Sequence, residues 1–156
     1  MEEGYFQEEG LDIELICGFG ADKTMTALLS GEADLGLLGP EATIYTNAGG
    51  LEDPVVNIAQ LTKRAGNFLI AREEMPNFAW SDLAGKNVLG GRKGGMPQMV
   101  FEYILQKNNL NPASDLTIDQ SIDFGSTAAA FSSGKGDFTV EFEPAATSLE
   151  NMGEGY

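Results

Sequence analysis

The chain has 156 residues, of which 42% are hydrophobic, and its 24 acidic and 9 basic residues give a formal net charge of −15. This composition is typical of a globular protein of one domain or two small lobes. A surface of this charge repels phosphate backbones, which argues against nucleic acid as a partner. The chain has no histidine and only one cysteine, so it lacks the commonest general base and metal ligand. We therefore predict no catalytic site, no metal site and no cofactor.

The first half of the chain alternates apolar runs with helical segments. Apolar runs of strand length cover residues 11–17, 33–38, 55–60 and 67–71, and helical patterns cover residues 23–30 and 41–48. Glycines follow both helical patterns and end them. Cys17 lies within the first apolar run, and a free cysteine usually packs as a small apolar side chain. We therefore expect Cys17 to be buried.

The second half shows the same alternation around a glycine-rich loop at residues 90–95 (Gly-Gly-Arg-Lys-Gly-Gly). Pro97 suits the first turn of a helix, where its missing N–H would have no partner. Strands are predicted from residue 87 and over residues 116–122 and 138–142, and helices over residues 97–107, 126–132 and 144–152. This alternation favours α/β units built around parallel sheets.

The chain also repeats a short pattern. Ser30-Gly31-Glu32-Ala33-Asp34 comes before an apolar run and Pro40, and Ser133-Gly134-Lys135-Gly136-Asp137 comes before an apolar run and Pro144. Both copies have the order helix, Ser-Gly turn, apolar strand, proline and helix. Two similar α/β units predict two similar lobes, which we place at residues 1–80 and 81–156, with the boundary between residues 74 and 85.

Four stretches form a series along the chain: residues 4–15 (GYFQEEGLDIEL), 27–36 (ALLSGEADLG), 81–86 (SDLAGK) and 142–144 (FEP). In this order they resemble the substrate-binding proteins of the nitrate/sulfonate/taurine and thiamine-precursor type. The resemblance implies an α/β protein with the type II periplasmic-binding-protein fold, in which two Rossmann-like lobes enclose a ligand cleft. In that family more chain lies before the first stretch and after the last. We therefore expect this chain to be truncated at both ends, with an incomplete first lobe.

The resemblance also implies a function. Such a protein is the extracytoplasmic solute-binding component of an ABC importer and is not an enzyme. Its partners are a small-molecule solute and the permease subunits, and it meets the membrane only through a lipid anchor on the full-length protein. The expected solute is a small organic anion such as a sulfonate, and the alternative is a pyrimidine precursor of thiamine.

Ligands of open α/β sheets bind beyond the carboxyl ends of the strands, where helix N-termini offer free backbone N–H groups. The chain has four such helix starts, at residues 18–24, 39–43, 90–98 and 124–127. Glycines let the backbone approach a ligand closely, and Arg92 or Lys93 would add charged donors. The predicted ligand-binding residues are Gly18, Phe19, Gly20, Asp22, Gly39, Glu41, Arg92, Lys93, Gly94, Gly95, Gln98, Ser126, Thr127 and Glu143.

Several of these residues have a structural alternative. The glycine-rich loop could equally be a solvated surface turn. Ser126 and Thr127 would also fit an ordinary N-cap, and Glu143 would also fit an acid that complements a helix dipole. Glu41, Glu141 and Glu143 point to a different ligand, because a carboxylate in the cleft would suit a cationic or amine-bearing molecule. Two other classes of protein remain open: a hydrolase that uses Glu141 and Glu143 as a carboxylate pair, and the ligand-sensing domain of a transcription regulator.

Overall fold

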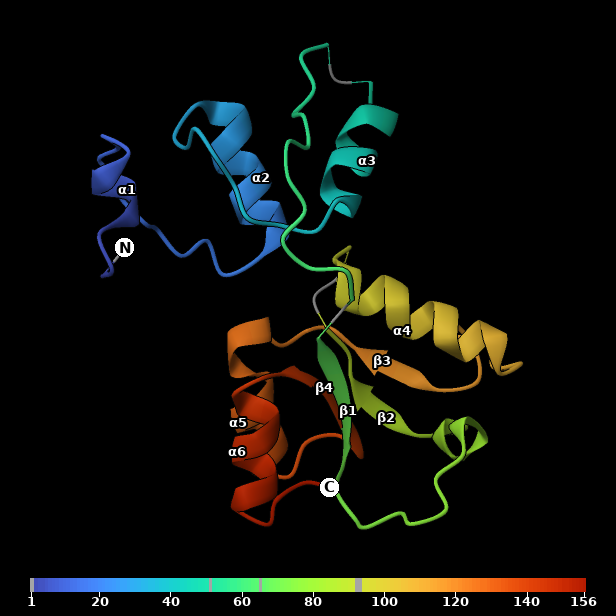
Figure 1. The fold of residues 1–156 in the computed structure, drawn as a ribbon. Helices are drawn as coiled ribbons and strands as arrows, with labels where there is room; N and C mark the ends of the chain where they lie inside the picture. Colours follow the sequence, from blue (N-terminus) through green and yellow to red (C-terminus); the bar gives the residue numbers. More distant parts are fainter. Residues whose placement is uncertain (1, 51, 65, 92–93) are drawn as a thin grey trace.

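A mixed sheet of four strands, formed within residues 67–142, organises the fold of the described residues (Figure 1). The computed structural model describes residues 2–50, 52–64, 66–91 and 94–156. The strands are β1 (Asn67–Ala71), β2 (Asn87–Leu89), β3 (Thr117–Asp119) and β4 (Phe138–Phe142), and they lie in the order β1-β4-β2-β3. β2 is parallel to β3 and β4, whereas β1 is antiparallel to β4. The carboxyl ends of β2, β3 and β4 therefore meet at one edge of the sheet.

Helices cover both faces of this sheet (Figure 1). One face packs against α4 (Met96–Lys107) and a 3-10 turn, η1 (Trp80–Leu83), through a cluster that includes Val140, Leu105 and Leu83. The other face packs against α5 (Thr127–Ser132) and α6 (Ala145–Asn151), through a cluster that includes Phe131 and Leu149. Successive side chains of a strand point to opposite faces of the sheet, so β1 and β2 contribute apolar side chains to both clusters.

The second-half elements confirm most of the predicted boundaries. The strand at residues 138–142 matches β4, and the helices predicted at residues 97–107, 126–132 and 144–152 match α4, α5 and α6 to within one residue at each end. The strand predicted over residues 116–122 is shorter, because its ladder with β2 ends at Asp119. After β3 the chain turns into a short 3-10 helix, η2 (Phe124–Ser126).

The described residues of the first half form three helices: α1 (Tyr5–Glu8), α2 (Ala21–Ser30) and α3 (Glu41–Ala48). α2 and α3 pack together, and Met25 of α2 is buried. Asn57, from the segment that leads back to the sheet, donates a hydrogen bond to the Thr43 hydroxyl of α3 at 2.9 Å.

The predicted strands at residues 11–17, 33–38 and 55–60 are not formed among the described residues. These segments have no regular secondary structure, and their apolar side chains, such as Leu15, Leu37 and Ile58, are more than 70% exposed. A strand requires a hydrogen-bonded neighbour, and the described sheet pairs none of these segments. The prediction that Cys17 is buried is also wrong for this chain, because Cys17 is exposed.

The two copies of the repeat have similar turns. Gly31 ends α2 in the left-handed conformation (φ 75°), and Gly134 follows α5 with φ 96°. Pro40 and Pro144 then directly precede α3 and α6. The copies differ in the segment between, which is strand β4 in the second copy and has no regular secondary structure in the first.

The division into lobes at residue 80 stays a prediction. β1, which lies before that boundary, pairs with β4, which lies after it, so one strand from the first part of the chain belongs to the sheet of the second. No helix within the described ranges is both long and apolar enough to cross a bilayer.

Candidate functional site

The starts of α3 and α4 come together across the two halves of the chain. Glu41, the first residue of α3, is only 4% exposed. Its Oε1 accepts a hydrogen bond of 3.0 Å from the backbone N–H of Met96, the first residue of α4. A helix N-terminus carries unpaired N–H groups and partial positive charge, so the Glu41 carboxylate occupies a position that suits an anion.

Gly39 makes room for this carboxylate. A Cβ at residue 39 would overlap the carboxylate of Glu41, so only glycine lets that side chain fold back over the turn. The second carboxylate oxygen, Oε2, is buried and has no hydrogen-bond partner among the residues that the structure describes. The predicted residues Gly39 and Glu41 thus lie at the contact between the two helix starts.

The turn before α2 has the geometry expected of a helix start. The Thr24 hydroxyl donates to the carbonyl oxygen of Gly20 at 3.0 Å. Phe19 has a positive φ of 52°, which is unusual for a residue with a side chain, and it is 71% exposed. Asp22 lies exposed in the first turn of α2. Phe19 therefore does not pack in the core.

The start of α4 is held by hydrogen bonds on both sides of the loop. The Gly94 N–H donates to Oε1 of Gln98 at 2.7 Å, so this predicted residue caps its own helix start. Gln120, directly after β3, donates from Nε2 to the carbonyl oxygen of Gly91 at 2.7 Å. Gly95 precedes the helix as its N-cap residue. Arg92 and Lys93, the charged residues predicted for this loop, lie outside the described residues.

The other predicted residues make contacts within their own turns. The Thr127 hydroxyl is buried and donates to the carbonyl oxygen of Phe124 at 2.8 Å, while Ser126 is exposed. The Glu143 carboxylate accepts from both the backbone N–H and the hydroxyl of Thr147, at 3.2 and 2.9 Å. Glu143 therefore caps the first turn of α6, as its structural alternative anticipated.

Gln120 follows β3, and Glu141 lies near the end of β4, so both are at the edge of the sheet where the carboxyl ends of the parallel strands meet. The predicted ligand-binding residues include neither of them. Gln120 directly follows a strand, so the rule that located the four helix starts would also have indicated it. Glu141 is 2% exposed and accepts a hydrogen bond of 2.7 Å from the Thr139 hydroxyl. Burial raises the pKa of Glu141, and the hydroxyls of Thr139 and Thr127 oppose that rise. Glu141 is thus buried and Glu143 exposed, so the two carboxylates lie in unlike environments.

We expect the Glu141→Gln variant to lose part of the pH dependence of stability. Because the pKa of Glu141 is raised above 4.5, the folded state binds a proton more tightly than the unfolded state. Its contribution to stability is therefore greatest at low pH and is lost as the pH rises through the raised pKa. Urea unfolding of both proteins from pH 4 to pH 7 measures this, and the variant should gain relative to wild type as the pH rises. If the unfolding free energies of the two proteins change with pH in parallel, the prediction is wrong.

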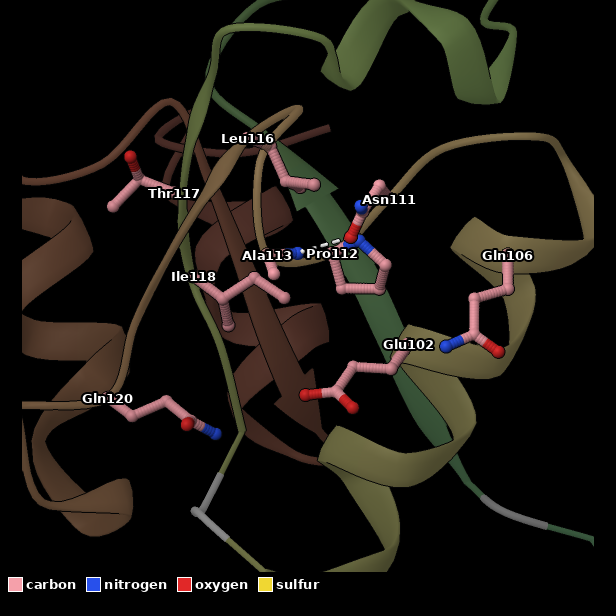
Figure 2. A pocket seen from close by; sticks show the side chains of 9 residues that line it. All are labelled: Glu102, Gln106, Asn111, Pro112, Ala113, Leu116, Thr117, Ile118 and Gln120. Carbon is pink, nitrogen blue, oxygen red and sulfur yellow. Dashed lines mark hydrogen bonds between the residues drawn. The ribbon is translucent and has the colours of Figure 1, made fainter.

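A cavity of about 540 Å³ lies elsewhere, between α4 and the edge strand β3. Figure 2 shows Glu102 and Gln106 of α4 facing Leu116, Ile118 and Gln120 across it. None of the predicted ligand-binding residues that the structure describes lines this cavity. We place the candidate site at the starts of α3 and α4 instead, because the backbone N–H groups at the start of α4 and the buried Glu41 carboxylate meet there. Within the described ranges, no three acidic or cysteine side chains cluster to hold a metal ion.

Comparison with known proteins agrees with this architecture. A structure from Bordetella bronchiseptica RB50 superposes with a TM-score of 0.72 at 25% identity, covering 99% of this chain and 48% of the other. The periplasmic aliphatic sulphonate binding protein SsuA from Escherichia coli superposes with a TM-score of 0.68 at 19% identity, covering 99% of this chain and 52% of the other. The chain therefore has the α/β fold of the periplasmic binding proteins.

The sequence comparisons define the family. The family model described as NMT1/THI5 like matches residues 1–154, and the chain belongs to this family. It is also 50% identical over 154 residues to "Putative binding protein YtlA" of Bacillus subtilis (strain 168), covering 99% of this chain and 46% of that protein. The chain thus spans about half the length of the relatives it matches.

Proposed function

We propose that the full-length protein containing this chain is the solute-binding component of an ABC importer and that it binds a small organic anion, such as a sulfonate. The observation that carries the proposal is the bond from the Met96 N–H to the Glu41 carboxylate. It brings two helix starts together at a place where an oxyanion is stabilised by backbone donors.

Family membership and the names of the relatives support binding in preference to catalysis. Two of the matched proteins are named as binding proteins, and the one named for binding aliphatic sulphonates shares the fold of this chain. Permease subunits as partners, an extracytoplasmic location and a lipid anchor on the full-length protein belong to the same proposal.

One observation favours a second candidate. Oε2 of Glu41 is buried and finds no partner in the described part of the chain, and a buried acceptor in this state is expected to be satisfied by a donor from the ligand. A pyrimidine precursor of thiamine would bring amino N–H groups to this oxygen. The two candidates differ in the charge of the ligand.

Native mass spectrometry of the gently purified full-length protein tests the proposal. We expect a retained small molecule whose accurate mass corresponds to an organic acid. A retained aminopyrimidine would select the second candidate. A protein that retains no solute, and whose thermal unfolding does not respond to a panel of sulfonates and pyrimidines, would contradict both.

A further inference from the structure

The contact between Glu41 and α4 has two properties that a simple structural hydrogen bond does not explain. The carboxylate comes from the first half of the chain and rests on a helix of the second half, 55 residues away. It is only 4% exposed, yet within the described ranges only one of its two oxygens has a hydrogen-bond partner.

α4 supplies no anion of its own at this end. It has 12 residues and no acidic residue in its first turn, and its N-cap, Gly95, makes no side-chain hydrogen bond to the helix. The charge that complements the α4 dipole therefore comes from Glu41. A carboxylate on a helix N-terminus occupies the same position, and uses the same N–H donors, as the acidic group of a bound anion would.

We infer that Glu41 is an internal competitor for the anion position at the N-terminus of α4, and that a solute binds there by displacing the Glu41 carboxylate from the Met96 N–H. This inference rests on the proposed function and adds to it a regulation of the site. Because Oε2 is unpaired, the seated carboxylate is only partly satisfied, and water outside the contact can solvate both of its oxygens. The Glu41 carboxylate at the N-terminus of α4 is therefore expected to exchange with an oxyanion whose oxygens are all hydrogen-bonded at that position.

Displacing the Glu41 carboxylate costs free energy, and this cost reduces the net binding free energy of the solute. The charge of Glu41 therefore lowers the affinity for anions. The carboxylate also links the two halves of the chain while the site is empty. Removing the charge should therefore strengthen anion binding, and removing the side chain should free the two halves to separate.

The test uses the full-length protein, stripped of retained solute by unfolding and refolding, with methanesulfonate as the probe. Calorimetry at low ionic strength compares wild type with Glu41→Gln, which keeps the shape and loses the charge. The matched control is Glu32→Gln, which removes the same charge from an exposed position in the same half of the chain. We expect Glu41→Gln to bind methanesulfonate about tenfold more tightly than wild type, and Glu32→Gln to stay within about twofold.

Three results would overturn the inference: equal or weaker binding by Glu41→Gln, an equal gain in Glu32→Gln, or no methanesulfonate binding by any of the proteins. Small-angle scattering of the solute-free Glu41→Ala variant provides a second measurement, since a larger radius of gyration than wild type is expected and an unchanged radius counts against the link. A solute retained in native mass spectrometry would leave the proposed function standing even if the inference fails.

Discussion

The Gly91→Ala variant is expected to bind the solute more than tenfold more weakly than wild type. Gly91 is buried, two residues after the end of β2, and a Cβ at this position would lie 2.5 Å from Cβ of Pro97. The rigid proline ring in the first turn of α4 cannot move alone, so the helix start must shift. That shift misplaces the backbone donors, and losing one hydrogen bond to a charged group costs roughly 1.5–3 kcal/mol.

Calorimetry on the full-length protein, with the solute identified by mass spectrometry, measures this effect. Gly66→Ala is the matched control, because a Cβ at Gly66 meets no atom within 4 Å and its φ lies outside the range that favours glycine. Binding by Gly91→Ala at the wild-type affinity would show that the position of the α4 start does not matter to the solute.

The Arg72→Ala variant is expected to lose about 2–4 kcal/mol of unfolding free energy. Arg72 follows β1, and its guanidinium donates to the carbonyl oxygens of Phe131, Lys135 and Gly136 at 2.8–3.1 Å. It also lies 4.1 Å from the centre of the Phe131 ring. One side chain therefore ties β1 to the end of α5 and to the turn before β4.

Arg72→Lys separates the charge from the geometry. Lysine keeps the positive charge but lacks the planar fork that reaches three carbonyl groups at once. The unfolding free energy measured in urea should be highest for wild type, lower for Arg72→Lys and lowest for Arg72→Ala. If the unfolding free energy of Arg72→Ala lies within about 0.5 kcal/mol of the wild-type value, water replaces the hydrogen bonds of the guanidinium without loss of stability, and the prediction is wrong.

The second half of the chain could be predicted from its sequence because its local signals agree with its tertiary contacts. The run at residues 138–142 reads as a buried strand, and β4 has a hydrogen-bonded neighbour on each side. Glycine and proline turns marked the starts of α3, α4 and α6 correctly. The three unformed strands show the limit of this approach, because a local pattern gives strand propensity but does not supply a pairing partner.

The candidate site was predictable only in part. The turn glycines and Glu41 follow from the rule that ligands meet helix starts beyond strand ends. The bond between Glu41 and Met96 joins residues 55 positions apart, and no short-range pattern encodes such a pairing. Glu141 was recognised as a carboxylate, but its burial depends on which face of β4 packs under α5, and that is decided by tertiary packing.

The exposure of Cys17 has a practical consequence. It is the one cysteine of the chain, and it lies directly before the Gly18 turn that leads into α2. A maleimide-linked fluorophore would therefore attach at a single known point of this chain, beside a predicted solute contact. Because such dyes respond to the polarity of their surroundings, solute uptake would be readable as a change in emission, which turns this exposed thiol into an optical reporter.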